Sequence, residues 1–159
     1  MKKGSTIFLK VVLVLMVAVA LTGLIRFPLS EGRAVNLDLL SIYMDPFIAY
    51  IYLASIPFFV ALYQSFKLLG YIGENKVFSL SSVKALRNIK YCAIILSAAI
   101  IMAAAYIRIF HNKDDDPAGF IAIAILATFI SAVVATAAAV FEKLLQTAVD
   151  IKSENDLTV

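Results

Sequence analysis

The sequence predicts an all-α integral membrane protein, a four-helix transmembrane bundle with both termini in the cytoplasm. The first observation is a set of four apolar runs of 15 to 25 residues without Asp, Glu, Lys, Arg or His: Val11–Ile25, Pro46–Phe66, Tyr91–Ile107 and Pro117–Phe141. A helix rises about 1.5 Å per residue, so about 20 apolar residues cross a hydrocarbon core of about 30 Å. The second observation is the composition of the chain: 62% hydrophobic and 16% charged residues are atypical of a soluble domain.

We expect one membrane domain over residues 1–159. Its spans are predicted at about 7–26, 46–68, 89–110 and 117–141. The connecting segments are then two outer loops at 27–45 and 111–116, an inner loop at 69–88 and a cytoplasmic tail at 142–159. The tail is expected to prolong the fourth helix beyond the membrane.

Two of the spans carry the same start signal. Asp45-Pro46 and Asp116-Pro117 each place an aspartate at the N-cap and a proline at the first helical position. The carboxylate accepts a bond from an otherwise unpaired amide, and proline has no amide to lose there. Pro57 lies in the middle of the second span and predicts a kink.

The first span has a competing interpretation. Met1-Lys2-Lys3, the apolar stretch and Ala18-Val19-Ala20 together resemble a cleavable secretory signal. The apolar run continues to Ile25 without a polar region before the cleavage position. This continuity favours an uncleaved helix.

Basic residues define the orientation. With the N-terminus inside, segments 1–10, 67–90 and 142–159 hold ten Lys and Arg residues, against four in the outer segments. Loops rich in Lys and Arg stay on the cytoplasmic side. The sequence therefore predicts a multi-pass protein whose termini are both cytoplasmic.

Residues suited to chemistry inside the membrane are missing. Proton or ion coupling needs an ionisable group within a span, and the four runs have none of the five charged types. The single Cys92 excludes an intramolecular disulfide and a multi-cysteine metal site. We therefore expect no enzyme activity, no cofactor and no metal. His111 beside Asp114–Asp116 could bind a divalent cation weakly, but a solvated turn is favoured.

Small residues recur every four positions in the fourth span. The two stripes are Ala124, Thr128, Ala132, Thr136 and Ala127, Ser131, Ala135, Ala139. Small side chains allow close approach of helices in lipid. They predict an ordinary close-packed bundle, and the sequence leaves open whether the chain forms a homo-oligomer.

In the outer segment, Asn36 is expected to cap a short interfacial helix running from Leu37 to Met44.

Two segments on the predicted cytoplasmic side carry a family resemblance. In the inner loop, Ser79 precedes a helix with Val83, Leu86 and Ile89 on one face, and the chain ends in Glu154-Asn155-Asp156-Leu157-Thr158-Val159. The Phe78, Ser79, Leu86, Arg87 pattern and this ending resemble the bacterial membrane family catalogued as domain of unknown function 2975. The resemblance implies residence in the bacterial plasma membrane.

Members of that family are often encoded beside a small helix-turn-helix regulator. The resemblance therefore implies a non-catalytic interaction or sensor protein that binds such a regulator and does not itself bind nucleic acid. The candidate partner-binding residues are Phe78, Ser79, Leu86, Arg87, Glu154, Asn155, Asp156, Leu157, Thr158 and Val159. The alternative is a small transporter, or an accessory subunit of a transport complex, with a polar path past Gln64, Ser97 and Ser131.

Overall fold

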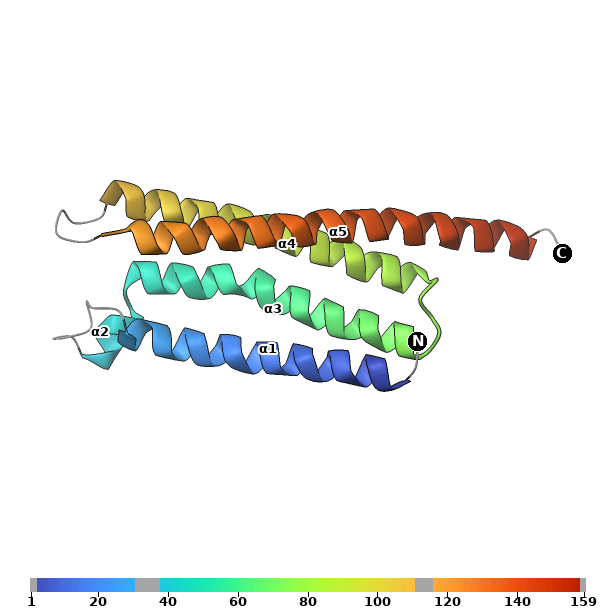
Figure 1. The fold of residues 1–159 in the computed structure, drawn as a ribbon, viewed down its shortest axis with the longest axis horizontal. Helices are drawn as coiled ribbons and strands as arrows, with labels where there is room; N and C mark the ends of the chain where they lie inside the picture. The colour runs from blue at the N-terminus through green and yellow to red at the C-terminus, as the bar shows by residue number, and fades with distance from the viewer. Residues whose placement is uncertain (1–2, 31–37, 111–115, 158–159) are drawn as a thin grey trace.

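The computed structural model describes residues 3–30, 38–110 and 116–157 and is all-helical within these ranges. Its helices are α1 (Lys3–Ser30), α2 (Leu39–Tyr43), α3 (Pro46–Gly73), α4 (Leu80–Phe110) and α5 (Ala118–Leu157). The four long helices have the length and hydropathy of membrane spans. They run alternately up and down, so the two ends of the chain lie at the same end of the molecule (Figure 1).

The long helices form an open row in chain order. α4 and α5 make the most extensive contact, followed by α3 with α4 and then α1 with α3. Among the described residues, α1 and α5 have no comparable contact with each other. The predicted bundle is therefore open on one side, with α3 and α4 as the inner helices of the row.

Aspartate side chains cap the starts of α3 and α5. Asp45 Oδ1 accepts a hydrogen bond from the Phe47 amide at 2.7 Å, and Asp116 Oδ1 accepts one from the Ala118 amide at 3.0 Å. Both predicted aspartate caps are thus confirmed. The short helix α2 begins at Leu39, and Asp38 at its N-cap position makes no side-chain cap bond. Asn36, expected to cap it, and Leu37 lie outside the described residues.

The turn between α3 and α4 is closed by backbone hydrogen bonds. The Lys76 amide donates to the Tyr71 carbonyl at 2.8 Å, and the Asn75 amide donates to the Ile72 carbonyl at 3.2 Å. Asn75 has φ 58°, the left-handed conformation that ends a helix in this pattern. Asparagine tolerates that conformation better than most non-glycine residues. The residues leading into α4 are thereby held next to the end of α3.

The α4–α5 contact buries one stripe of mostly small residues. On α5 the buried positions are Ala124, Ser131, Ala135, Ala138 and Glu142. From Ala124 to Glu142 is 18 residues, which equals five turns of about 3.6 residues. Residues spaced exactly four positions apart instead shift gradually around the helix, because one turn has about 3.6 residues. Ala132 and Thr136 therefore lie exposed. The predicted close packing holds, but only part of each predicted stripe is buried.

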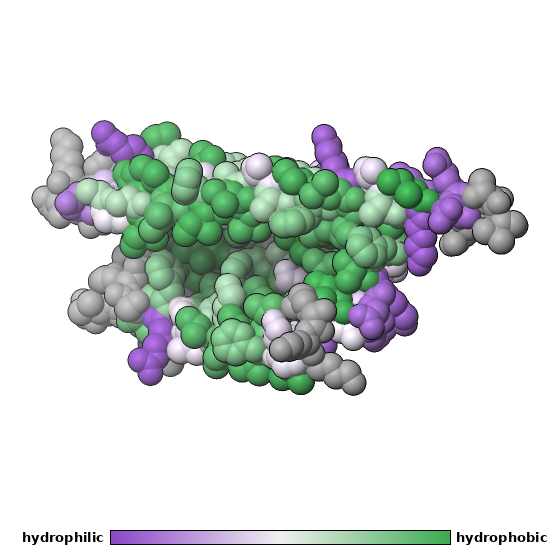
Figure 2. All heavy atoms as spheres, turned by 45° about the vertical axis from the view of Figure 1, so that its right-hand side comes forward, coloured by the Kyte–Doolittle hydropathy of each residue, from purple (hydrophilic) through white to green (hydrophobic). Residues whose placement is uncertain are grey.

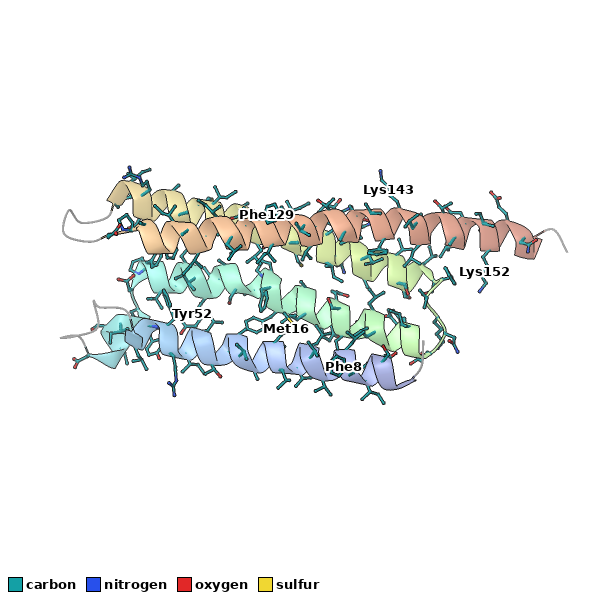
Figure 3. All side chains as sticks on the ribbon, viewed as in Figure 1. Phe8, Met16, Tyr52, Phe129, Lys143 and Lys152 are labelled. Carbon is teal, nitrogen blue, oxygen red and sulfur yellow. The ribbon has the colours of Figure 1, made fainter. Side chains whose placement is uncertain are left out.

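A tyrosine compensates for a proline inside α1. Pro28 has no amide proton, so the carbonyl of Leu24, four residues earlier, lacks its usual donor within the helix. The Tyr52 hydroxyl of α3 donates to this carbonyl at 2.8 Å. Tyr52 lies between α3 and α1 (Figure 3). The proline in one helix and the tyrosine in the next therefore form a complementary pair.

We predict that Tyr52→Phe destabilises the fold, because it leaves the Leu24 carbonyl without a donor in apolar surroundings. The expected cost is about 1–3 kcal/mol. Pro28→Ala restores the amide donor, so the same tyrosine substitution should cost less in that background. Unfolding in detergent, followed by circular dichroism, measures this double-mutant cycle. Equal costs in the two backgrounds would show that the pair is not coupled.

Candidate functional site

The first predicted site segment, Phe78 to Arg87, lies at the start of α4. The Ser79 hydroxyl accepts a hydrogen bond from the Ser82 amide at 3.3 Å, so Ser79 caps the helix. Leu86 is buried at 7% exposure together with Val83 and Ile89, which confirms that the three share one face. Phe78 and Arg87 are exposed. Of these four predicted residues, Ser79 and Leu86 stabilise the helix, and Phe78 and Arg87 lie at the surface.

Arg87 belongs to a three-residue ionic cluster that joins α4 to α5. Its Nε donates to Glu142 Oε1 at 2.7 Å, and Lys90 Nζ donates to Glu142 Oε2 at 2.7 Å. The Glu142 side chain is only 11% exposed, whereas the Lys90 and Arg87 side chains are 21% and 52% exposed. Each carboxylate oxygen thus has its own cationic donor, and the carboxylate is nearly covered.

The cluster lies at the edge of the apolar runs. Glu142 is the first residue after the run 117–141, Lys90 immediately precedes the run 91–107, and Arg87 lies three residues before Lys90. Hydrogen bonds from Lys90 and Arg87 lower the pKa of the Glu142 carboxyl, and the bond to Glu142 raises the pKa of Arg87. Glu142 and Arg87 are therefore both charged at neutral pH.

The second predicted site segment lies at the end of α5. Glu154 and Asn155 are exposed, and the helix extends through Asp156 and Leu157. Thr158 and Val159 lie outside the described residues. The structure therefore places residues 154–157 at the C-terminal end of the same helix that carries Glu142.

Between the cluster and the chain end, α5 presents apolar side chains. Leu144 and Ile151 are each 61% exposed and lie seven residues apart, which places them on the same helix face. A hydrogen bond of 2.8 Å from Gln146 Nε2 to Asp150 Oδ1 adds support within this segment. Lys143 and Lys152 point to opposite sides of the helix (Figure 3). We call residues 142–157 the tail helix.

Glu142 was missed by the sequence reasoning, which assigned it to the tail without a role. A signal was present, since Glu142 is a lone acidic residue at a span border facing a loop rich in Lys and Arg. Its partners are 52 and 55 positions away in the chain. Only the packing of α4 on α5 shows which basic residues pair with Glu142.

The structure describes only some of the remaining sequence candidates. His111, Asp114 and Asp115 lie outside the described residues, and Asp116 serves as a cap. In the described ranges, no group of three His, Cys, Asp or Glu side chains is arranged to hold a metal ion. Ser97 donates to the Ala93 carbonyl one turn earlier, a bond within its own helix.

We predict that Glu142→Gln destabilises the protein by about 1–3 kcal/mol, because it leaves two cations without their shared anion. Folding lowers the pKa of Glu142. The cluster therefore stabilises the fold at pH values above the ordinary carboxyl pKa, and this stabilisation is lost as the pH falls below about 4.5. Thermal unfolding in detergent at several pH values measures both effects. The substituted protein should lose less stability than the native one on acidification.

Glu74→Gln is the matched control for this prediction. Glu74 pairs with Lys76 at 2.9 Å, but both side chains are more than half exposed. Exposed pairs contribute little to stability. An equal effect of the Glu74 and Glu142 substitutions would contradict a structural role for the buried cluster.

Comparison with known proteins agrees with this architecture. A family model described as "Protein of unknown function (DUF2975)" matches residues 8–159. The "Uncharacterized membrane protein YoaS" of Bacillus subtilis (strain 168) is 46% identical, and the alignment covers 100% of both chains. No solved structure matches the chain. The chain, a membrane protein with four apolar helices and a bacterial homologue, therefore belongs to the family of domain of unknown function 2975.

Proposed function

We propose that this chain is a non-catalytic membrane protein that binds a cytoplasmic helix-turn-helix regulator through its tail helix. The observation that carries the proposal is the tail helix itself, which continues α5 beyond the apolar run and exposes Leu144 and Ile151 on one face. An exposed apolar stripe on a helix is suited to packing against a helix of another protein. The helix-turn-helix class of the partner comes from the family resemblance.

Charge supports the placement of this end in the cytoplasm. Lys84, Arg87, Lys143 and Lys152 are exposed at the end of the molecule that holds both termini. Cytoplasmic segments are enriched in Lys and Arg. In this proposal the protein lies in the plasma membrane with both termini inside, and the start of α4 and the tail helix face the regulator.

The lining of the apolar space between the long helices favours this function over transport. The residues that line the space between the helices include no Asp, Glu, Lys, Arg or His. Ser131 is among these lining residues, but Gln64 and Ser97 are not. Only one of the three residues of the polar path that the sequence suggested therefore lines this space. Coupled transport and catalysis need ionisable groups at such positions.

We predict that Lys152→Cys is protected from a membrane-impermeant maleimide in intact cells and is labelled after permeabilisation. Asp38→Cys, at the opposite end, should be labelled in both. Both variants are made in a Cys92→Ser background, since Cys92 is the only cysteine. Asp38 makes no side-chain cap bond, so its replacement removes no hydrogen bond. Labelling of Lys152→Cys in intact cells would contradict the cytoplasmic tail.

We predict that Leu144→Ser combined with Ile151→Ser reduces recovery of the regulator about tenfold or more, because it removes two apolar anchors from the contact. The measurement is co-purification of the full-length, tagged chain with a helix-turn-helix regulator of the kind that the family resemblance implies, produced in the same cells. Deletion of residues 154–159 tests the end of the tail separately.

Thr147→Ser is the matched control, because Thr147 is exposed in the same segment and the replacement keeps the hydroxyl that donates to the Lys143 carbonyl. Each variant is first shown to insert in the membrane in the native amount. Unchanged recovery of the regulator with both the double substitution and the deletion would rule out the tail helix as its binding site.

A further inference from the structure

An apolar groove runs between α1 and α5. α1 packs on α3 and α5 packs on α4, while α1 and α5 stand apart on either side of this pair. The surface is hollowed between the two helix pairs, and the residues around the hollow are apolar (Figure 2). The groove therefore has α3 and α4 as its floor and the other two long helices as its walls.

Two adjoining cavities occupy the groove, with volumes of about 490 and 410 Å³. They share the lining residues Phe58, Leu96, Ile100 and Ala127, so they form one continuous space. Along α3 the lining extends from Tyr50 to Ser65, a rise of about 22 Å. The groove is thus longer than one leaflet of the hydrocarbon core, which is about 15 Å thick.

The chemistry of the lining is suited to hydrocarbon. The lining contains no Asp, Glu, Lys, Arg or His. Three of its hydroxyl groups already donate to backbone carbonyls: Tyr50 to Ala99 at 2.7 Å, Ser55 to Tyr52 at 2.7 Å and Ser65 to Ala61 at 2.8 Å. A polar ligand would lose its hydration here and would find these three protons already bonded.

The size of the groove selects a thin occupant. A helix with its side chains is about 10–12 Å across, so ten residues of it fill on the order of 1,200–1,700 Å³. The two cavities together are smaller than that volume. Cavities of about 300–1,000 Å³ suit small or chain-like apolar ligands. The groove is therefore better suited to a chain-like ligand than to a transmembrane helix of a second copy.

We propose that this groove is a binding site for one acyl chain of a membrane phospholipid. The chain enters sideways from the bilayer between α1 and α5 and lies along the floor of α3 and α4. It packs against the aromatic rings of Phe58, Phe59 and Phe120, which lie in or around the same space. The argument for this lipid site does not rest on the tail helix or on any partner in the cytoplasm.

The test uses the purified full-length chain in detergent with phosphatidylglycerol that carries a diazirine in one acyl chain. Native mass spectrometry should detect one lipid per chain, and photolysis should cross-link the lipid mainly to peptides from α3 and α4. Ala127→Phe places a ring at the junction of the two cavities and should reduce the adduct about tenfold or more.

Ala137→Phe is the matched control, because Ala137 lies exposed on the same helix and does not line the groove. Circular dichroism and gel filtration verify the fold of each variant, and Ala54→Phe replaces Ala127→Phe if the latter does not fold. Cross-links spread over all apolar surfaces, or an adduct that both groove substitutions leave unchanged, would overturn the proposal. If the native chain formed cross-linked dimers that only the groove variants lost, the groove would bind a second copy of the chain, and the lipid proposal would be overturned.

Discussion

Helices in lipid have no hydrophobic reason to associate, and this constraint governs every contact in the structure. Lipid chains are as apolar as leucine side chains, so helix pairs are held by close packing and by the few polar bonds between them. The described helices use both. α4 and α5 approach along Ala124, Ser131 and Ala135, and hydroxyls of Tyr50 and Tyr52 bond carbonyls of α4 and α1. Within the four apolar runs, exposed leucine and isoleucine residues are ordinary, and the informative groups there are the polar ones.

The two ends of the helix row are held together by different kinds of contact. At the end near α2, aromatic rings join three helices, with Phe47 centred 6.1 Å from Tyr106 and 6.3 Å from Phe120. Such ring pairs contribute about 0.5–1.5 kcal/mol beyond the area that they bury. At the other end, the Glu142 cluster joins α4 to α5 by charge. The pair α4–α5 is therefore fixed near both ends, while α1 is held through α3 and α2.

Local features of this fold could be predicted from the sequence, because neighbouring residues determine them. The aspartate caps at Asp45 and Asp116 and the buried face of Val83, Leu86 and Ile89 depend on three or four adjacent positions. Features that join distant segments could not be predicted. Tyr52 and the Leu24 carbonyl, or Arg87 and Glu142, are brought together only by helix packing. The open row of helices also depends on tertiary contacts that no periodic pattern encodes.

The candidate binding site stays a prediction from the sequence. The tail and the start of α4 were chosen from their residues, and the structure shows that Leu86 is buried and that Ser79 caps the helix. The structure also links the tail to the groove, because α5 is one uninterrupted helix that lines the groove from Phe120 to Val134 and then continues as the tail helix. A helix transmits displacement along its axis, and Glu142 lies between its two parts. Any shift of the tail relative to α4 must therefore break or carry with it two charged hydrogen bonds of 2.7 Å.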